Sequence, residues 1–293
     1  AEANLYPQAP RFFSAASPAS QQFLQTAWEL CREHSHLFIL EPEGGDADLL
    51  LQDLALWHSH SDQAPECIAL EDCVAGGTAA WQDRIARSES PAVLGVRLSS
   101  LEQIADAQQH WQPLAEHTDA AASILSVYVL TGEFSQSAFL QSAGSAACVV
   151  PRLRERPSDI AAYVRRLSGL AAGARGLSEP VTFSAEAVYA IMAHAWPRNY
   201  EQLKQVITAA VEQSPAGELS LDALQSALGA QEMPPPPEDR MQALMTHSQR
   251  YQLEVALDAS AGSVTQLARQ LQLSGSIQTQ QDLQSMRLMD PKL

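Results

Sequence analysis

The sequence predicts an α/β fold in which a parallel β-sheet carries helices on both faces and is followed by an all-helical region. Two observations support this prediction. Short apolar runs of the length of a buried strand alternate with segments of helical periodicity through the first half of the chain. From residue 159 onward, each periodic segment has helical spacing. With 293 residues, the chain is long enough for two or three compact units and a sizeable core.

The first half begins with a leader, residues 1–12, in which Pro7 and Pro10 interrupt any regular element. A helix is expected next, because Ser17 and Pro18 are typical of a helix start and precede the periodic stretch Phe23–Cys31. Beyond it, strands are expected at Leu37–Leu40, Cys67–Leu70, Ala92–Leu98 and Ile124–Leu130, and helices at Leu49–Trp57 and Leu101–Leu114.

The second half is expected to be helical. Helices are predicted over residues 159–170, 184–195, 199–212 and 221–228, and Pro234–Pro237 then form a stiff extended spacer. The predicted domains are a leader at 1–12, an α/β core at 13–151, a helical domain at 152–230, a linker at 231–239 and a C-terminal helical unit at 240–293. The chain begins at Ala1 rather than at a methionine, which is compatible with a preceding segment.

The charge of the chain is negative and unevenly distributed. The formal net charge is −16, of which residues 1–151 carry −14, residues 152–230 carry zero and residues 231–293 carry −2. An acidic first half repels nucleic acid and free nucleotides at long range, so a polyanion needs a local basic cluster. The cluster that the sequence offers consists of Arg152, Arg154, Arg156, Arg165 and Arg166. Its alternative interpretation is an ordinary domain junction with solvated arginines.

Cysteine usage and hydropathy indicate a cytoplasmic protein. The four cysteines show no C-x-x-C spacing, and neither a secretory signal nor a long apolar run is present. We therefore expect no structural disulfide and no membrane contact. Two histidine pairs, His34 with His36 and His58 with His60, have a spacing that binds Zn²⁺ or Cu²⁺ when two such pairs meet. Because no cysteine or aspartate lies at a supporting spacing, we predict no metal site.

Two motifs in the helical region are specific. Leu153–Ile160 reads L-R-E-R-P-S-D-I, and Trp196–Asn199 reads W-P-R-N. They resemble the P-L-R-E-R-x-E-D-I and W-P-G-N-V-R-E-L motifs of the AAA+ domain of bacterial enhancer-binding proteins, the activators of sigma-54 RNA polymerase. The resemblance is strong over residues 149–226 and weaker elsewhere. It implies an AAA+ three-layer parallel-sheet core, an all-α lid and a C-terminal helix-turn-helix of the Fis type.

The resemblance also identifies the turn after the first strand as the position of the P-loop. A P-loop presents backbone N–H groups and a lysine to phosphate oxygens, but this chain has no lysine before Lys204. Pro42 lacks an N–H group, and four carboxylates in the turn oppose a triphosphate. We therefore expect an acidic strand-to-helix turn, capped by Asp46 or Asp48, that binds neither ATP nor another cofactor. The residues of this degenerate P-loop are Glu43, Gly44, Gly45, Asp46, Ala47 and Asp48.

Other positions that the family uses for ATP hydrolysis are also changed. By the resemblance, Val96 and Arg97 stand where the Mg²⁺-binding Asp and the water-activating Glu belong. Thr131–Gly132 replace the sensor residues, and Glu201 replaces the lid arginine. The loop that the family uses to contact sigma-54 is missing from residues 72–90. We therefore expect no enzymatic activity and no catalytic residue.

The C-terminal unit resembles a degenerate Fis-type helix-turn-helix. Ala256–Leu257 and Leu267–Ala268 match its first two helices, but the recognition helix carries little positive charge. The candidate DNA-binding residues are Arg269, Ser274, Ser276, Gln278 and Gln280. The alternative is a helical tail that only dimerises.

These features favour a transcriptional regulator of the enhancer-binding-protein type that acts without hydrolysing ATP. Its expected partners are DNA, a second copy of the chain or an AAA+ paralogue. Two alternatives stay open: a pseudo-AAA+ scaffold for protein interactions without DNA binding, and a sensor of an anionic ligand, such as a cyclic dinucleotide, at the arginine cluster.

Overall fold

The computed structural model describes residues 7–59, 65, 67–72, 92–111, 124–177, 181–214 and 218–229. These residues fall into two compact units that divide between Arg152 and Leu153, and the short segment Ala16–Ala19 groups with the second unit. The predicted linker and C-terminal unit, with all five candidate DNA-binding residues, lie outside the described residues. Among the described helices, none is long and apolar enough to cross a membrane.

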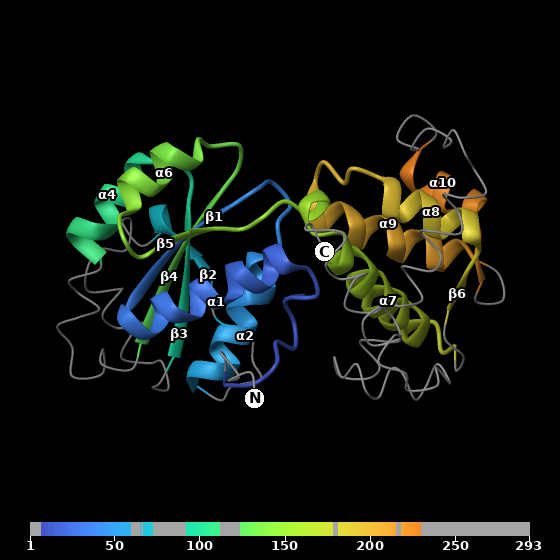
Figure 1. Cartoon of the computed structure of the whole chain (residues 1–293), viewed down its shortest axis with the longest axis horizontal. Helices are drawn as coiled ribbons and strands as arrows, with labels where there is room; N and C mark the ends of the chain where they lie inside the picture. Colours follow the sequence, from blue (N-terminus) through green and yellow to red (C-terminus); the bar gives the residue numbers. More distant parts are fainter. Residues whose placement is uncertain are drawn as a thin grey trace, which may run out of the picture. The chain divides into compact units, whose positions relative to one another are not determined.

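The first unit contains a five-stranded sheet with the strand order β2-β3-β4-β1-β5 (Figure 1). All of its strand pairs are parallel, as the sequence predicts. In the register of β1 and β4, Glu41 is the partner of Thr131. The strands are β1 (His36–Glu41), β2 (Cys67–Ala69), β3 (Ala92–Leu98), β4 (Ile124–Thr131) and β5 (Ala147–Val149).

Helices cover both faces of this sheet and make a three-layer core (Figure 1). One face carries α1 (Pro18–Glu33) and α2 (Ala47–Ser59), and the other carries α4 (Glu102–Asp106) and α6 (Gln136–Ala143). The side chains of β1 alternate between the two cores, because successive residues of a strand point to opposite faces. Leu37 and Ile39 pack under α1 and α2, whereas Phe38 and Leu40 pack on the α4 and α6 side. Burial on both faces explains why the strands are continuous apolar runs.

Three elements of the first unit differ from the sequence-based prediction. The helix expected at Leu101–Leu114 is the short α4, which continues as a π-helical turn over Ala107–Trp111. The sequence pattern does not indicate β5 or α6, because three and eight residues are too few to show a period. The start of α6 is nevertheless marked by Ser135, whose hydroxyl accepts a hydrogen bond from the Ala138 N–H at 3.4 Å.

The second unit is built mainly of helices, in which α9 packs against both α7 and α10. The helices are η3 (Leu153–Glu155), α7 (Pro157–Ala174), α8 (Ala185–Ala193), α9 (Asn199–Gln213) and α10 (Leu221–Leu228). The four helices expected here all form. One correction is needed, because the unit is not entirely helical: β6 (Thr182–Phe183) and β7 (Glu218–Leu219) pair as a short parallel ladder. Strands of two residues carry no detectable period.

Candidate functional site

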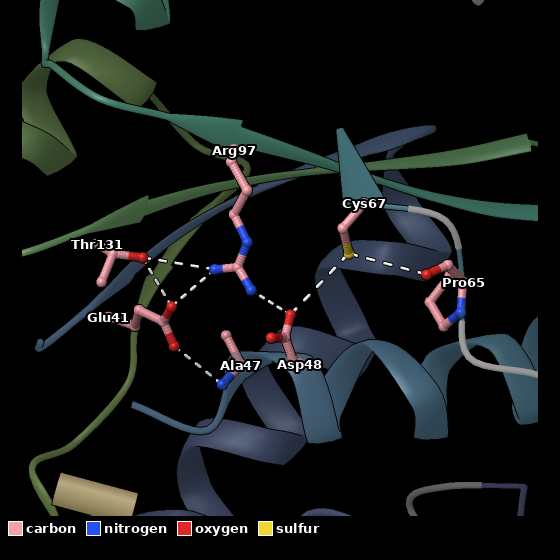
Figure 2. Close-up of polar contacts among 7 residues, drawn as sticks. All are labelled: Glu41, Ala47, Asp48, Pro65, Cys67, Arg97 and Thr131. Atoms are coloured by element: carbon pink, nitrogen blue, oxygen red, sulfur yellow. Dashed lines mark hydrogen bonds and ion pairs between the residues drawn. The ribbon is translucent and has the colours of Figure 1, made fainter. Parts of the chain in front are cut away.

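The carboxyl edge of the central sheet brings polar side chains from three strands together (Figure 2). Glu41 ends β1, Thr131 ends β4, and Arg97 is the next-to-last residue of β3. The helices that follow β1 and β4, α2 and α6, cover opposite faces of the sheet. Such a change of face between neighbouring strands marks the place where open parallel sheets bind ligands. We refer to Glu41, Ala47, Asp48, Arg97 and Thr131 as the Glu41 network.

Glu41 is the centre of this network. Its Oε1 accepts hydrogen bonds from Arg97 NH1 at 2.8 Å and from Thr131 Oγ1 at 2.7 Å. Its Oε2 accepts a hydrogen bond at 2.9 Å from the backbone N–H of Ala47, the first residue of α2. The first N–H groups of a helix have no partner within the helix and carry partial positive charge. The Glu41 carboxylate therefore satisfies one of these groups from within the protein.

Arg97 links two carboxylates. Its NH1 pairs with Glu41, and its NH2 pairs with Asp48 in the first turn of α2. Burial lowers the pKa of Arg97, but the charges of Glu41 and Asp48 raise it by more, so the guanidinium stays charged. The side chain of Cys67, on β2, points toward Asp48 (Figure 2), and its Sγ lies 3.9 Å from Asp48 Oδ1.

The carboxylate of Glu41 has an unusual environment for an ionised group. Its side chain is 5% exposed. Burial raises the pKa of Glu41, and the Thr131 hydroxyl, the Arg97 charge and the Ala47 N–H lower it only in part. The net result is a pKa above the ordinary value for glutamate. This shift gives the network a measurable dependence on pH.

The predicted P-loop residues form the turn between β1 and α2 together with the first two residues of α2. Glu43 is exposed, and Gly44 has a φ of 68°, a left-handed conformation that favours glycine. The Gly45 N–H donates to the carbonyl oxygen of Pro42 at 3.0 Å, which closes the turn. The four acidic side chains of this segment differ in burial: Glu41 and Asp46 are buried, whereas Glu43 and Asp48 are exposed.

The start of α2 explains the roles of the last three predicted residues. Asp46 directly precedes the helix, and its carbonyl oxygen accepts a hydrogen bond from the Leu49 N–H at 3.0 Å. Ala47 donates its N–H to Glu41, and Asp48 pairs with Arg97. The segment is thus an acidic turn in which the Ala47 N–H, at the start of α2, already donates to Glu41.

Comparison with known proteins identifies the architecture. Residues 154–240 match the AAA+ ATPase lid domain family. The crystal structure of NtrX from Brucella abortus is 14% identical, with a TM-score of 0.52 over 93% of this chain and 69% of the NtrX chain. NtrX in complex with ADP is 16% identical, with a TM-score of 0.50 over 89% of this chain and 67% of that chain. The chain has the AAA+ fold. No curated protein sequence matches it.

In the AAA+ lid, the two motifs that carry the resemblance contact each other. Asn199 Oδ1, at the start of α9, accepts a hydrogen bond from the Leu153 N–H at 2.9 Å. Trp196 is 1% exposed, and its indole N–H donates to the carbonyl oxygen of Ile191 at 2.9 Å. Glu201 is an exposed residue of α9 that accepts a hydrogen bond from Gln205 at 3.4 Å. The motifs thus hold the lid helices together.

The five arginines of the predicted basic cluster belong to two units and differ in burial. Arg152 belongs to the AAA+ core and pairs with Glu133. Arg156 is 1% exposed and pairs with Asp159 inside the lid. Arg154 and Arg165 are exposed, and the guanidinium carbon of Arg166 lies 5.7 Å from the ring centroid of Tyr163. The burial of Arg156 removes the middle of the cluster from solvent.

The predicted histidine pairs are only partly described. The rings of His34 and His36 lie 5.6 Å apart, and His58 lies near the end of α2, while His60 lies outside the described residues. In the described part of the chain, no group of three histidine, cysteine, aspartate or glutamate side chains has an arrangement that would hold a metal ion.

Sequence reasoning treats Arg97 and Thr131 as replacements of lost functional groups and misses their joint role. A signal for it exists in the sequence. Glu41 and Arg97 are opposite charges at the ends of two strongly apolar runs, Leu37–Leu40 and Ala92–Leu98. Because the carboxyl ends of parallel strands share one edge of the sheet, this pattern places both charges at that edge, and the strand order then decides whether they meet.

Proposed function

We propose that this chain is a regulatory protein with an AAA+ core and lid that neither binds nor hydrolyses ATP, and that it acts in transcription through DNA or another regulator. The observation that carries the proposal is the hydrogen bond from the Ala47 N–H to the buried Glu41 carboxylate at 2.9 Å. Helix starts of this kind bind phosphate in P-loop proteins. A phosphate that approached Ala47 would meet the charge of Glu41.

The composition of the sheet edge supports the same proposal. Arg97 is the cation of the network, and its two terminal nitrogens already pair with Glu41 and Asp48. The chain has no lysine before Lys204 that would supply a second cation to a triphosphate. NtrX from Brucella abortus has been crystallised with ADP, so this fold is able to hold a nucleotide. Loss of nucleotide binding in the present chain would therefore be a property of its residues and not of its fold.

The direct test is calorimetry of the full chain with Mg-ATP and Mg-ADP. We expect no binding with a dissociation constant below roughly 100 μM, which corresponds to about −5.5 kcal/mol. A phosphate-release assay with the same preparation should show no turnover. A tighter dissociation constant would overturn the nucleotide-free proposal.

The regulatory part rests on the sequence motifs of enhancer-binding proteins and on the fold shared with NtrX. A gel-shift experiment on genomic DNA fragments tests it. With only Arg269 and Arg287 as basic residues near the predicted recognition helix, binding should be weak. Its log–log salt dependence should be shallow, with a slope of about −2 to −4 per dimer. We expect removal of residues 238–293 to abolish binding.

Two outcomes distinguish the regulator from the scaffold. If the full chain binds none of the fragments, the regulatory proposal fails and a scaffold for protein interactions replaces it. If the truncated chain binds DNA as well as the full chain does, the helix-turn-helix assignment is wrong.

Self-association is a separate expectation, which sedimentation at low and high salt measures. It should weaken with salt because the acidic core and the arginines of the lid have opposite charges.

A further inference from the structure

We infer that Glu41 is a built-in occupant of an oxyanion site, whose carboxylate fills the place that an external oxyanion would take at the start of α2. The inference rests on the proposed function and deepens it by naming the group that keeps the site closed. It also specifies the chemistry of the closed site, which is suited to a sulfate, a phosphate or a small carboxylate.

The first argument is the convergence of donors in Figure 2. A backbone N–H of α2, a guanidinium of β3 and a hydroxyl of β4 all donate to one carboxylate, at distances of 2.7 to 2.9 Å. These are the donor types that bind oxyanions in proteins: an N–H at a helix start, an arginine and a hydroxyl. The helix has 13 residues, so its first turn carries the full partial charge of a helix end.

The second argument is independent and concerns the backbone of the turn. A Cβ on Gly45 would lie 2.6 Å from Glu41 Oε2 and 3.0 Å from the Pro42 carbonyl oxygen. The chain at Gly45 therefore runs close to the carboxylate, and a side chain there would require the carboxylate or the turn to shift. Glycine is needed where backbone approaches a ligand this closely. Here the group in the place of the ligand belongs to the protein itself.

The third argument is that the site should survive the loss of the Glu41 carboxylate. Arg97 NH2 pairs with Asp48, whose side chain is 63% exposed, and this ion pair does not involve Glu41. Ala47 is fixed by α2, and Thr131 by the pairing of β4 with β1. Removal of the Glu41 side chain should therefore leave three donors around a space of the size of a carboxylate.

The test uses the full chain, with Glu41→Ala as the opened variant and Asp48→Ala as the matched control. Asp48→Ala removes a carboxylate from the same network but leaves Glu41 in place. Thermal unfolding is followed in sodium sulfate and in sodium formate, with sodium chloride at matched ionic strength as the reference. For Glu41→Ala we expect a rise in Tm that grows with the logarithm of the anion concentration and reaches about 3–6 °C at a tenfold excess over the dissociation constant. Sulfate also stabilises folded proteins in general, because it is excluded from their surface. Wild type and Asp48→Ala should therefore show only this smaller, common rise, and the rise of Glu41→Ala should exceed it.

An absence of anion-specific stabilisation in Glu41→Ala overturns the inference, and so does an equal response of Asp48→Ala. If Glu41→Ala does not fold, Glu41→Ser, which also empties the site, replaces it under the same criterion. If neither variant folds at any sulfate concentration, the inference also fails, because it assigns an external oxyanion the role of the lost carboxylate. The titration of wild type with Mg-ATP separates the two proposals. If wild type binds ATP, the proposed function is overturned. If wild type does not bind ATP and sulfate and formate do not stabilise Glu41→Ala specifically, only this inference is overturned.

Discussion

Asp159 lies 3.7 Å from Arg156 in the lid, and neither side chain is more than 1% exposed. The Asp159 carboxylate also accepts hydrogen bonds from the Ala16 N–H at 2.7 Å and the Ser17 N–H at 3.1 Å. Ser17 Oγ in turn accepts a hydrogen bond from the Ser158 N–H at 3.1 Å. A buried carboxylate is tolerated when hydrogen bonds and an opposite charge satisfy it, and the backbone before α1 supplies two such hydrogen bonds to Asp159.

Substitution Asp159→Ala should therefore destabilise the lid strongly. It leaves the Arg156 charge buried without its carboxylate, and a loss of this kind costs about 3–5 kcal/mol in the free energy of unfolding. Urea unfolding followed by circular dichroism measures the change. Glu212→Ala, at an exposed position of α9, serves as the control and should stay within about 0.5 kcal/mol of wild type. A change below about 1 kcal/mol in Asp159→Ala would contradict the role of this ion pair.

The contact between Gly45 and Glu41 predicts a destabilising Gly45→Ala substitution. The added methyl group would lie 2.6 Å from Glu41 Oε2 and 3.0 Å from a backbone oxygen. Either the carboxylate or the turn must move, at a cost of about 1–3 kcal/mol in the free energy of unfolding. Urea denaturation of wild type and variant measures the cost.

A matched substitution should have the opposite sign. Gly169 lies inside α7, and a Cβ there would meet no atom within 4 Å. Gly169→Ala should stabilise the protein by roughly 0.5–1 kcal/mol, because alanine loses less backbone entropy in a helix. If both substitutions change the free energy of unfolding by the same amount, the close contact between Gly45 and the Glu41 carboxylate does not affect stability.

The sequence predicts those elements that carry a pattern of their own. The strand at Leu37–Leu40 is buried on both faces, and α10 begins and ends at the predicted residues. The strand β5 has only three residues and forms because it pairs with β1, which lies in another part of the chain. Elements of this kind cannot be recognised from local periodicity.

The site could be predicted only in part, for a related reason. The turn at residues 41–48 is visible in the sequence as acidic and short of positive charge. Its partners are 56 and 90 positions away, at Arg97 and Thr131, and they reach Glu41 because the sheet has the order β3-β4-β1. The residue types give the charges, but only the strand order shows which charges meet.

The pH dependence of stability should reveal the raised pKa of Glu41. Since its pKa is higher in the folded than in the unfolded chain, the folded state binds more protons through the pH range between the two values. The contribution of Glu41 to the free energy of unfolding therefore rises as the pH falls through the folded pKa. Other carboxyl groups also titrate, so the comparison must be made with Glu41→Gln, which lacks this one group.

The difference in unfolding free energy between wild type and Glu41→Gln should shift in favour of wild type between pH 7 and about pH 5. Urea denaturation at a series of pH values gives this difference. A constant difference would mean that the pKa of Glu41 is not shifted. A shift in favour of Glu41→Gln would mean that Arg97 and Thr131 lower the pKa by more than burial raises it.

The hydrogen bond between the two lid motifs predicts that different substitutions of Asn199 lower the free energy of unfolding by different amounts. This residue has a φ of 47°, in the left-handed region, and its Oδ1 accepts the hydrogen bond from the Leu153 N–H. Asn199→Gly keeps the backbone conformation but loses the acceptor, at a cost of about 1 kcal/mol. Asn199→Ala also adds left-handed strain, for a total of about 2–3 kcal/mol. Urea denaturation should therefore show a smaller loss of stability for Asn199→Gly than for Asn199→Ala. If Asn199→Ala and Asn199→Gly lower the free energy of unfolding equally, the left-handed backbone at this position is not strained. The residue then stabilises the lid through its hydrogen bond alone.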